Sequence, residues 1–303
     1  MFQFFKLYDT IVLVNGGTVL HKFLRSIGFS LINKKELEEI IEDAINKPEI
    51  MRISKDFDGN EFVELSKEFT NGLGLRIIGN FETSNSFRMD NYFPYYLGNQ
   101  ITTQQKIDIE SYAGICDDAN LGITLIFHLQ NTADYLSENR KRNVQSKIYG
   151  AKLSGLSTEG KILLPIKQTV AKEKEYSRAK KRSELVTKAI DGNQEAIDNL
   201  AIEDMDMYAL LSKRIEKEDI LSIVLTTMIP YGIENDLYNI IAEIIDFSEI
   251  KNYLSQEEMY ILNVKCNNLI FDVCINKSDL FGEPAIGRRF KGNLWMQGSI
   301  CLD

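Results

Sequence analysis

Few residues in this sequence have the type and spacing that catalysis needs. The 303 residues include two histidines, His21 and His128, and both fall within apolar segments. A histidine-based catalytic triad or metal site therefore has almost no support. The sequence also lacks a GxSxG nucleophile elbow, a Walker phosphate loop and a GxGxxG dinucleotide motif. We therefore predict no catalytic residues, no metal ligands and no bound cofactor.

Carboxylates leave one route to an enzyme open. Asp117 and Asp118 follow Cys116 in a loop that could bind a metal with ligands from elsewhere, although a solvated turn explains the same residues. An enzyme that works through carboxylates alone needs a pocket in which carboxylates of shifted pKa converge. This enzyme is the third of our function hypotheses.

Positive charge is concentrated in one segment of an acidic chain. The net charge of the whole chain is -9, yet residues 140–182 hold thirteen Lys and Arg against three Asp and Glu. Residues 183–260 hold seventeen acidic and five basic residues. The basic segment therefore either pairs with its acidic neighbour or binds an external anion. Its candidate contact residues are Arg140, Lys141, Arg142, Lys180, Lys181 and Arg182.

A second cationic string lies near the C-terminus. Residues 282–292 contain three glycines, a proline and three basic residues, and they precede Trp295, the one tryptophan of the sequence. A cationic loop that leads into a strand could grip an anion or a nucleic acid. Its candidates are Arg288, Arg289 and Lys291. The alternative is a turn-rich connection whose arginines pair with the acidic middle region.

An aromatic stretch surrounds Pro94. Tyr92, Phe93, Tyr95 and Tyr96 could form a stacking platform or a patch that binds a partner. The alternative is a core strand whose tyrosine hydroxyls reach solvent. Pro94 favours an edge or a bulge for this strand, because proline cannot donate a ladder hydrogen bond.

The elements that must position these residues begin with two short helices. Apolar residues at helical spacing between Leu20 and Ile27 predict a helix that Gly28 ends as a C-cap. Asn33, followed by Glu36, predicts a capping box at the start of the next helix. Pro48 ends that helix.

The period of the apolar residues then changes to that of strands. A hairpin is predicted around Asp58-Gly59, a second hairpin around Glu159-Gly160, and a helix between Thr132 and Lys141. The predicted strands of this half cover residues 50–55, 61–68, 73–81, 87–96, 123–129, 149–156 and 161–165. Because most of them are neighbours in the sequence, we predict a mostly antiparallel sheet in an α+β fold.

The rest of the chain predicts two further parts. Residues 167–217 have a helical character. The predicted strands beyond them cover residues 220–229, 237–247, 259–266, 269–275 and 293–300. Five short strands with small turns predict a small β-barrel, and an OB-like barrel is one form of it. We therefore expect an α+β domain at 20–166, a helical connector at 167–217 and a small β-barrel domain at 218–303.

Residues 1–19 have two interpretations. Asn15-Gly16-Gly17 can be encoded by a bacterial ribosome-binding sequence, and Leu20 follows at the distance of a start codon. On this hypothesis, residues 1–19 are an upstream extension and the native protein begins at Leu20. The alternative is a genuine N-terminal strand or helix.

The four cysteines indicate a reducing compartment. Cys116, Cys266, Cys274 and Cys301 form no CxxC pair, so we interpret them as free thiols. No apolar stretch approaches the roughly 20 residues that span a bilayer. We therefore expect a cytoplasmic protein that does not bind a membrane.

Several strings resemble those of a known family. They are residues 20–29, 111–118, 159–166 and 282–298, and the resemblance covers Leu20 to Asp303. The chain resembles an uncharacterised family of proteins from anaerobic Gram-positive bacteria that is catalogued only as a domain of unknown function. The resemblance implies a bacterial cytosolic protein and implies no activity, ligand or site residue.

The absence of a catalytic constellation and the segregated charge favour a non-catalytic binding or adaptor protein. Nucleic-acid binding, to RNA or DNA, through residues 140–182 and the loop 287–292 is the alternative. The partner would then be a protein or a nucleic acid.

Overall fold

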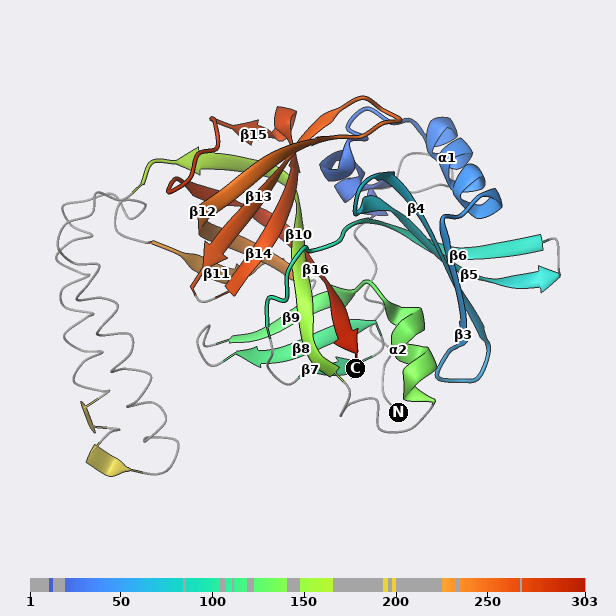
Figure 1. Cartoon of the computed structure of the whole chain (residues 1–303), viewed down its shortest axis with the longest axis horizontal. Helices are drawn as coiled ribbons and strands as arrows, with labels where there is room; N and C mark the ends of the chain where they lie inside the picture. Colours follow the sequence, from blue (N-terminus) through green and yellow to red (C-terminus); the bar gives the residue numbers. More distant parts are fainter. Residues whose placement is uncertain are drawn as a thin grey trace. The chain divides into compact units, whose positions relative to one another are not determined.

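The computed structural model is drawn in Figure 1. It describes residues 11–12, 20–83, 86–103, 107–110, 112–118, 123–140, 148–165, 193–195, 198–199, 225–232, 235–267 and 269–302. The chain divides into two compact units, of which one joins Met1–Leu163 to Thr226–Asp303 and the other is Leu164–Leu225. The predicted helical connector at 167–217 falls in the second unit and, apart from the two short stretches named above, lies outside the described residues.

The N-terminal elements follow the capping signals of the sequence. Strand β1 (Ile11–Val12) pairs with β2 (Leu20–His21), and the 3-10 helix η1 (Lys22–Ile27) follows. The prediction that Gly28 caps this helix is confirmed, since Gly28 has a φ of 89°. The capping box of Asn33 and Glu36 is confirmed at the start of helix α1 (Lys34–Asn46). Residues 1–10 and 13–19 lie outside the described part of the chain.

The smaller sheet is formed entirely by hairpins. Its strand order is β3-β4-β5-β6, and all three pairings are antiparallel. The strands are β3 (Ile50–Lys55), β4 (Glu61–Thr70), β5 (Leu73–Thr83) and β6 (Ser86–Tyr96). The predicted turn at Asp58-Gly59 is confirmed, and Gly59 has a φ of 92°, which glycine adopts without steric cost.

The larger sheet combines strands from both halves of the chain. Its order among the described residues is β11-β12-β13-β14-β10-β16-β9-β8-β7, with β15 beside β10 and an additional β12–β16 pairing. The sheet is mixed, because β10 runs parallel to β14 and β16 runs parallel to β9. The elements are β7 (Ile107–Glu110), β8 (Ala113–Asp118), β9 (Ile123–Leu129), α2 (Thr132–Asn139), β10 (Ile148–Leu163), β11 (Thr227–Pro230), β12 (Leu237–Lys251), β13 (Glu258–Cys266), β14 (Leu269–Asn276), η3 (Lys277–Asp279), β15 (Leu280–Phe281) and β16 (Arg289–Leu302).

The predicted fold class is wrong. The protein is mostly β, and the C-terminal strands do not form a small barrel domain of their own. Strand β10, which precedes the predicted helical connector, lies between β14 and β16 and joins strands from both sides of the connector into one mixed sheet. Period and propensity reveal that a segment is a strand, but they do not reveal its partner in a distant part of the chain.

The predicted hairpin around Glu159-Gly160 is also wrong. Residues 148–163 form one continuous strand with an irregularity between Ser157 and Gly160. Gly160 is needed for packing, since an added Cβ there would lie 2.4 Å from the Phe290 ring. A glycine that lets a ring approach the backbone looks the same in the sequence as a turn glycine.

Two apolar clusters fill the first unit. One packs around the larger sheet and includes Phe127, Phe271 and Phe290. The other lies among the smaller sheet, η1, α1 and the larger sheet, and it includes Phe93 and Trp295. Because residues of both sheets share the second cluster, the two sheets bury one another's apolar side chains.

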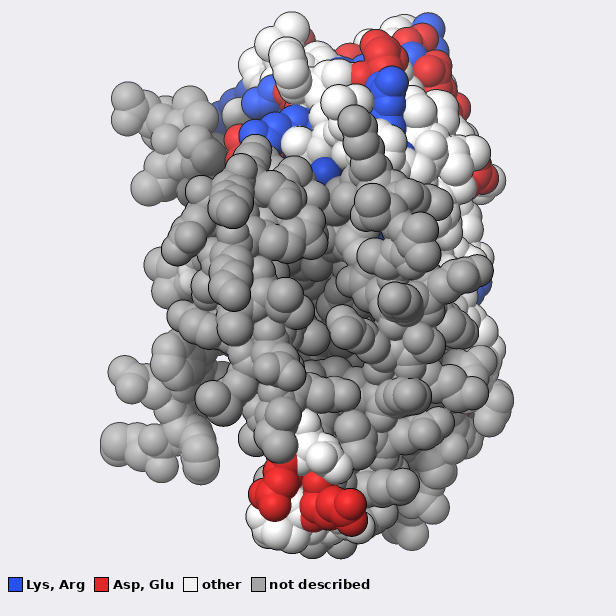
Figure 2. Space-filling view, turned by 90° about the vertical axis from the view of Figure 1, so that its left-hand side faces the viewer, with Lys and Arg blue, Asp and Glu red and all other residues white. Residues whose placement is uncertain are grey.

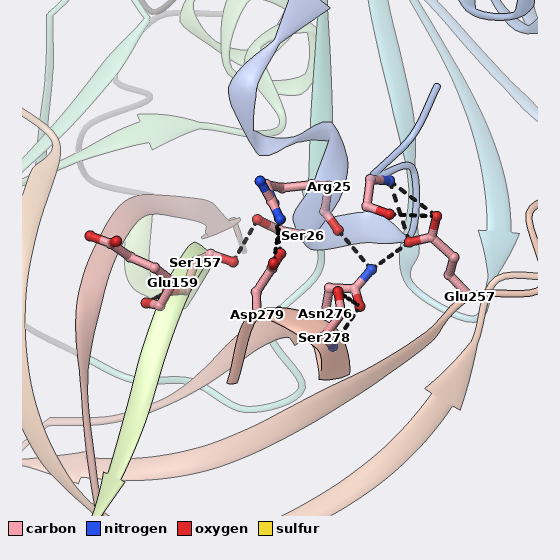
Figure 3. Close-up of polar contacts among 9 residues, drawn as sticks. Arg25, Ser26, Ser157, Glu159, Glu257, Asn276, Ser278 and Asp279 are labelled. Atoms are coloured by element: carbon pink, nitrogen blue, oxygen red, sulfur yellow. Dashed lines mark hydrogen bonds and ion pairs between the residues drawn. The ribbon is translucent and has the colours of Figure 1, made fainter. Parts of the chain in front are cut away.

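Polar contacts hold η1 against the larger sheet, as Figure 3 shows. The Arg25 guanidinium pairs with the Asp279 carboxylate. The Ser26 hydroxyl donates to the carbonyl of Ser157 over 2.7 Å. Asn276 Nδ2 donates to the carbonyl of Arg25 over 3.3 Å. The carbonyl of Arg25 also accepts from the backbone N–H of Gly28, so the Asn276 amide is a second donor to it.

The structure bears on two sequence predictions, one about membrane-spanning segments and one about the cysteines. In the described part of the chain, no helix is long and apolar enough to cross a membrane. All four cysteines are free, and three of them are buried: Cys116, Cys266 and Cys274. Burial raises the pKa of the Cys266 thiol to about 12. These thiols therefore pack as small apolar side chains.

Candidate functional site

The aromatic stretch lies in the core. Tyr92, Phe93, Tyr95 and Tyr96 are between 3% and 7% exposed. The Phe93 ring lies 4.7 Å from the ring of His128 and 6.4 Å from that of Trp295, both in the larger sheet. The larger sheet and η1 therefore cover this end of β6, and no ring remains exposed for a partner to stack on.

The structure describes four of the predicted basic residues: Arg140, Arg288, Arg289 and Lys291. Lys141, Arg142, Lys180, Lys181 and Arg182 lie outside the described residues. Arg140 is exposed at the C-terminal end of α2. Arg288 Nη1 donates to the carbonyl of Glu283 over 2.7 Å, and Arg289 is only 5% exposed. Lys291 is part of the lining of a hollow.

Lys291 lies beside a second lysine that the sequence analysis did not select. In the β10–β16 ladder, Lys161 is the direct partner of Lys291. In the β10–β15 pairing, Lys161 is also the partner of Phe281. Residues paired directly across a sheet point to the same face. Lys291, Lys161 and Phe281 therefore stand in a row on one face of the larger sheet.

Asparagines complete this surface. Asn239 Nδ2 donates to Asn293 Oδ1 over 2.8 Å, and Asn293 Nδ2 donates to Glu159 Oε1 over 2.7 Å. Together with Gly160 and Gly292, these residues line a hollow of about 380 Å³. We call Lys161, Lys291, Phe281, Asn239 and Asn293 the lysine face.

The strand irregularity positions Glu159 at the border of the lysine face. The Ser157 hydroxyl donates to the carbonyl of Glu159 over 2.9 Å, and Figure 3 shows the Glu159 side chain directed away from the Arg25–Asp279 pair. The Glu159 carboxylate accepts the hydrogen bond from Asn293 described above, and it lies within the lining of the hollow. With two lysines and one glutamate, the lining has a net charge of +1.

Two features of the lysine face favour an external partner. Neither Lys161 nor Lys291 forms an ion pair with another described residue. Like charges directly opposite each other on a sheet are destabilising, by an amount of order 0.2–1 kcal/mol. In addition, the Phe281 side chain is 82% exposed. The face thus offers two ammonium groups and an aromatic ring side by side.

The glycines of the C-terminal string shape this surface. Gly282 directly follows Phe281 and has a φ of 92°, so it turns the chain after β15. Gly292 lies opposite Gly160, and an added Cβ there would be 2.5 Å from the Phe290 ring. The Phe290 ring therefore packs beneath the site, and β16 carries Lys291 and Asn293 past it.

Charge near the upper edge of Figure 2 is mixed. Lys and Arg side chains gather there, with Asp and Glu side chains among them.

Across the described residues, no group of three or more His, Cys, Asp or Glu side chains could hold a metal ion. The backbone places Asp117 and Asp118 at the end of β8, away from the lysine face in the strand order. The lysine face itself presents ammonium, amide and aromatic groups.

The sequence did not identify four members of the lysine face as candidate site residues. Lys161 counted toward the basic segment, but its strand partners were unknown. Phe281, Asn239 and Asn293 had no local motif, and only the pairing of β10, β12, β15 and β16 brings them together. The one local signal was the cationic string that contains Lys291.

Comparison with known proteins identifies a family and nothing more specific. No curated protein and no solved structure matches the chain. Residues 24–298 match the model of DUF3881, which is described as a domain of unknown function after an E. rectale gene. This match includes the strands of both sheets and the lysine face. The chain therefore belongs to the DUF3881 family.

Proposed function

We propose that this protein is a non-catalytic binding protein and that the lysine face binds a ligand with a phosphate group and an aromatic base. Single-stranded nucleic acid and free nucleotides share this chemistry. The observation that carries the proposal is the pairing of Lys161 with both Lys291 and Phe281 on one face.

Each group on the face has a role that matches such a ligand. A phosphate between the two ammonium groups would relieve the repulsion between them and would release counterions. A base would stack on the exposed Phe281 ring, and stacking of this kind contributes about 1–3 kcal/mol per base. The Asn239–Asn293 amide pair would contact the sugar or the base edge at the border of the hollow.

The proposal is non-catalytic because the groups at the face do not include a nucleophile with an adjacent base. Ammonium, amide and phenyl groups position a ligand, whereas general acid–base catalysis needs a group that titrates near the working pH. A cytoplasmic location, expected from the free thiols, is part of the same proposal.

The test measures binding of a fluorescently labelled single-stranded oligonucleotide by anisotropy. Changing both lysines to glutamine (Lys161→Gln with Lys291→Gln) should weaken binding at least about 10-fold. It should also reduce the slope of log K against log salt by about 0.7, since the two lysines share one phosphate and each single-strand phosphate contact contributes about 0.7. Phe281→Ala should cost about 1–3 kcal/mol, which is about 5- to 150-fold in Kd.

Matched variants separate this surface from other positive charges. Lys55→Gln removes an exposed lysine of the smaller sheet and should leave binding unchanged. A variant with residues 180–182 changed to glutamine tests the basic segment. Titration with a mononucleotide distinguishes a nucleotide from a strand as the ligand. Binding that is lost only in the 180–182 variant, or no binding of either probe at low salt, would contradict the proposal.

A further inference from the structure

We propose a second interaction site, independent of the lysine face, in a groove between α1 and residues 252–257. We call it the acidic groove. It has a volume of about 740 Å³. The occupant that fits it is a segment of another protein in which large apolar side chains are flanked by lysine or arginine.

The floor of the acidic groove is aromatic and aliphatic. Phe29 and Phe69 are buried, and their rings meet edge to face with centroids 4.9 Å apart. Ile32 and Ile40 lie beside them and are half-buried. An apolar floor of this kind gains free energy when it covers an apolar side chain of a partner.

Large apolar side chains also project from the rim. Leu31 is 90% exposed, Tyr253 is 54% exposed and Leu254 is 52% exposed. All three line the same groove. A single exposed leucine needs no explanation, but apolar side chains that gather around a concave surface mark an interaction site.

The charges of the lining select the partner. Four carboxylates line the groove, and Lys67 is its one cation, so the net charge of the lining is -3. The four are Glu36, Glu39, Asp43 and Glu257. The hydrogen bond from Lys67 holds the pKa of the Asp43 carboxyl below its ordinary value, so this group is ionised at neutral pH. Complementary charge therefore favours a basic segment and disfavours an acidic one.

The wall formed by residues 252–257 is fixed in advance. Asn252 is fully buried, its Nδ2 donates to the carbonyl of Ile27 over 2.9 Å, and its Oδ1 accepts from the backbone N–H of Leu254 over 2.8 Å. The Tyr253 hydroxyl donates to the carbonyl of Glu68 over 2.6 Å. Because the wall is already ordered, a partner loses less entropy when it binds.

Glu257 ties the far end of the groove to the rest of the fold. Its Oε1 accepts from the Ser30 hydroxyl over 2.8 Å. Asn276 Nδ2 donates to its Oε2, and Figure 3 shows these two side chains facing each other. The carboxylate therefore stays at the end of the groove. There it contributes a negative charge whose position does not depend on the partner.

The test uses the full chain and a labelled synthetic peptide with leucine at positions i, i+3, i+4 and i+7 and lysine elsewhere. The double variant Leu31→Ser with Leu254→Ser should weaken peptide binding at least about 10-fold, because it removes apolar contact area. Glu39→Gln should weaken binding less and should lower its salt dependence. A peptide of the same pattern with glutamate in place of lysine should not bind.

Controls make each outcome decisive. Ile286→Ser changes a side chain that is 69% exposed outside the groove and should leave peptide binding unchanged. Thermal unfolding shows whether each variant is folded. Equal peptide binding by the double variant and the parent would overturn the proposal. A dimer that the double variant abolishes would also overturn it, because a second copy of the chain would then occupy the groove. Stronger peptide binding when residues 180–182 are changed to glutamine would overturn it as well, because the chain's own basic segment would then be the occupant.

Discussion

Arg76 and His128 form a buried contact between the two sheets. Arg76 Nη2 lies 2.5 Å from His128 Nε2, and Arg76 Nη1 donates to the carbonyl of Leu129 over 2.8 Å. His128 is 3% exposed. Burial and the nearby guanidinium hold the pKa of His128 well below 6.5. The imidazole is therefore neutral in the folded protein and accepts a hydrogen bond from Arg76.

This contact predicts a loss of stability in mild acid. The folded pKa of His128 lies below the unfolded value, so the unfolded chain takes up the proton first. The stabilisation is complete above about pH 6.5 and is lost as the pH falls below it, by up to about 1.4 kcal/mol per pH unit. Burial also lowers the pKa of His21, to about 3, so His21 adds a slope of the same sign. Urea unfolding should therefore show a steeper pH dependence in the parent than in His128→Gln, which keeps His21 and an acceptor for Arg76.

Glu64 contributes with the opposite sign to the same measurement. It is 1% exposed, and burial raises the pKa of its carboxyl although Arg76 and Arg52 oppose the shift. Its Oε2 accepts from the backbone N–H of Ala133 at the start of α2. Protonation of Glu64 therefore favours the folded state as the pH falls. A parallel pH dependence in the parent and in His128→Gln would show that His128 does not carry the effect.

At the scale of elements, β10 decides the architecture. It pairs with β14, β15 and β16, and it carries both Lys161 and the irregularity at Ser157–Gly160. Gly160 and Gly292 lie opposite each other, and each lies close to the Phe290 ring. The Glu159-Gly160 pair, which predicts a turn from the sequence, thus lies within a continuous strand that passes over the Phe290 ring.

This arrangement predicts that Gly160→Ala is destabilising because of overpacking. The new methyl group would meet the Phe290 ring, and the free energy of unfolding should fall by about 1–3 kcal/mol. Phe290→Leu in the same chain should recover part of that loss, so the two changes should not be additive. Additive effects in a double-mutant cycle would indicate that Gly160 is needed for its backbone conformation instead.

At the scale of the whole molecule, the two halves of the chain complete one sheet. The family match extends from residue 24 to residue 298 and therefore includes strands of both halves. The larger sheet needs β10 between β14 and β16, and β9 on the other side of β16. A chain that lacked the first half would leave long strand edges unpaired and apolar faces uncovered.

The fragment of residues 218–303 should therefore not fold by itself. Its circular dichroism should show no cooperative thermal transition, whereas the full chain should show one. The full chain measured under the same conditions is the control. A sharp transition for the fragment would mean that its strands form an independent domain, as the sequence alone had suggested.

The sequence by itself determined the local features of this protein. The cap at Gly28, the capping box of Asn33 and Glu36 and the turn at Asp58-Gly59 depend on contacts within a few residues. The existence of most strands followed from the period of their apolar residues. Family membership also followed from strings within the sequence.

Only the tertiary structure decided which residues meet. Strand pairing between Lys161, Lys291 and Phe281 joins positions more than a hundred residues apart, and no local propensity encodes that choice. The same is true of Tyr92 to Tyr96, whose burial depends on the larger sheet that covers them. Non-local pairing sets burial and exposure, and exposure determines which side chains are available to a ligand or partner.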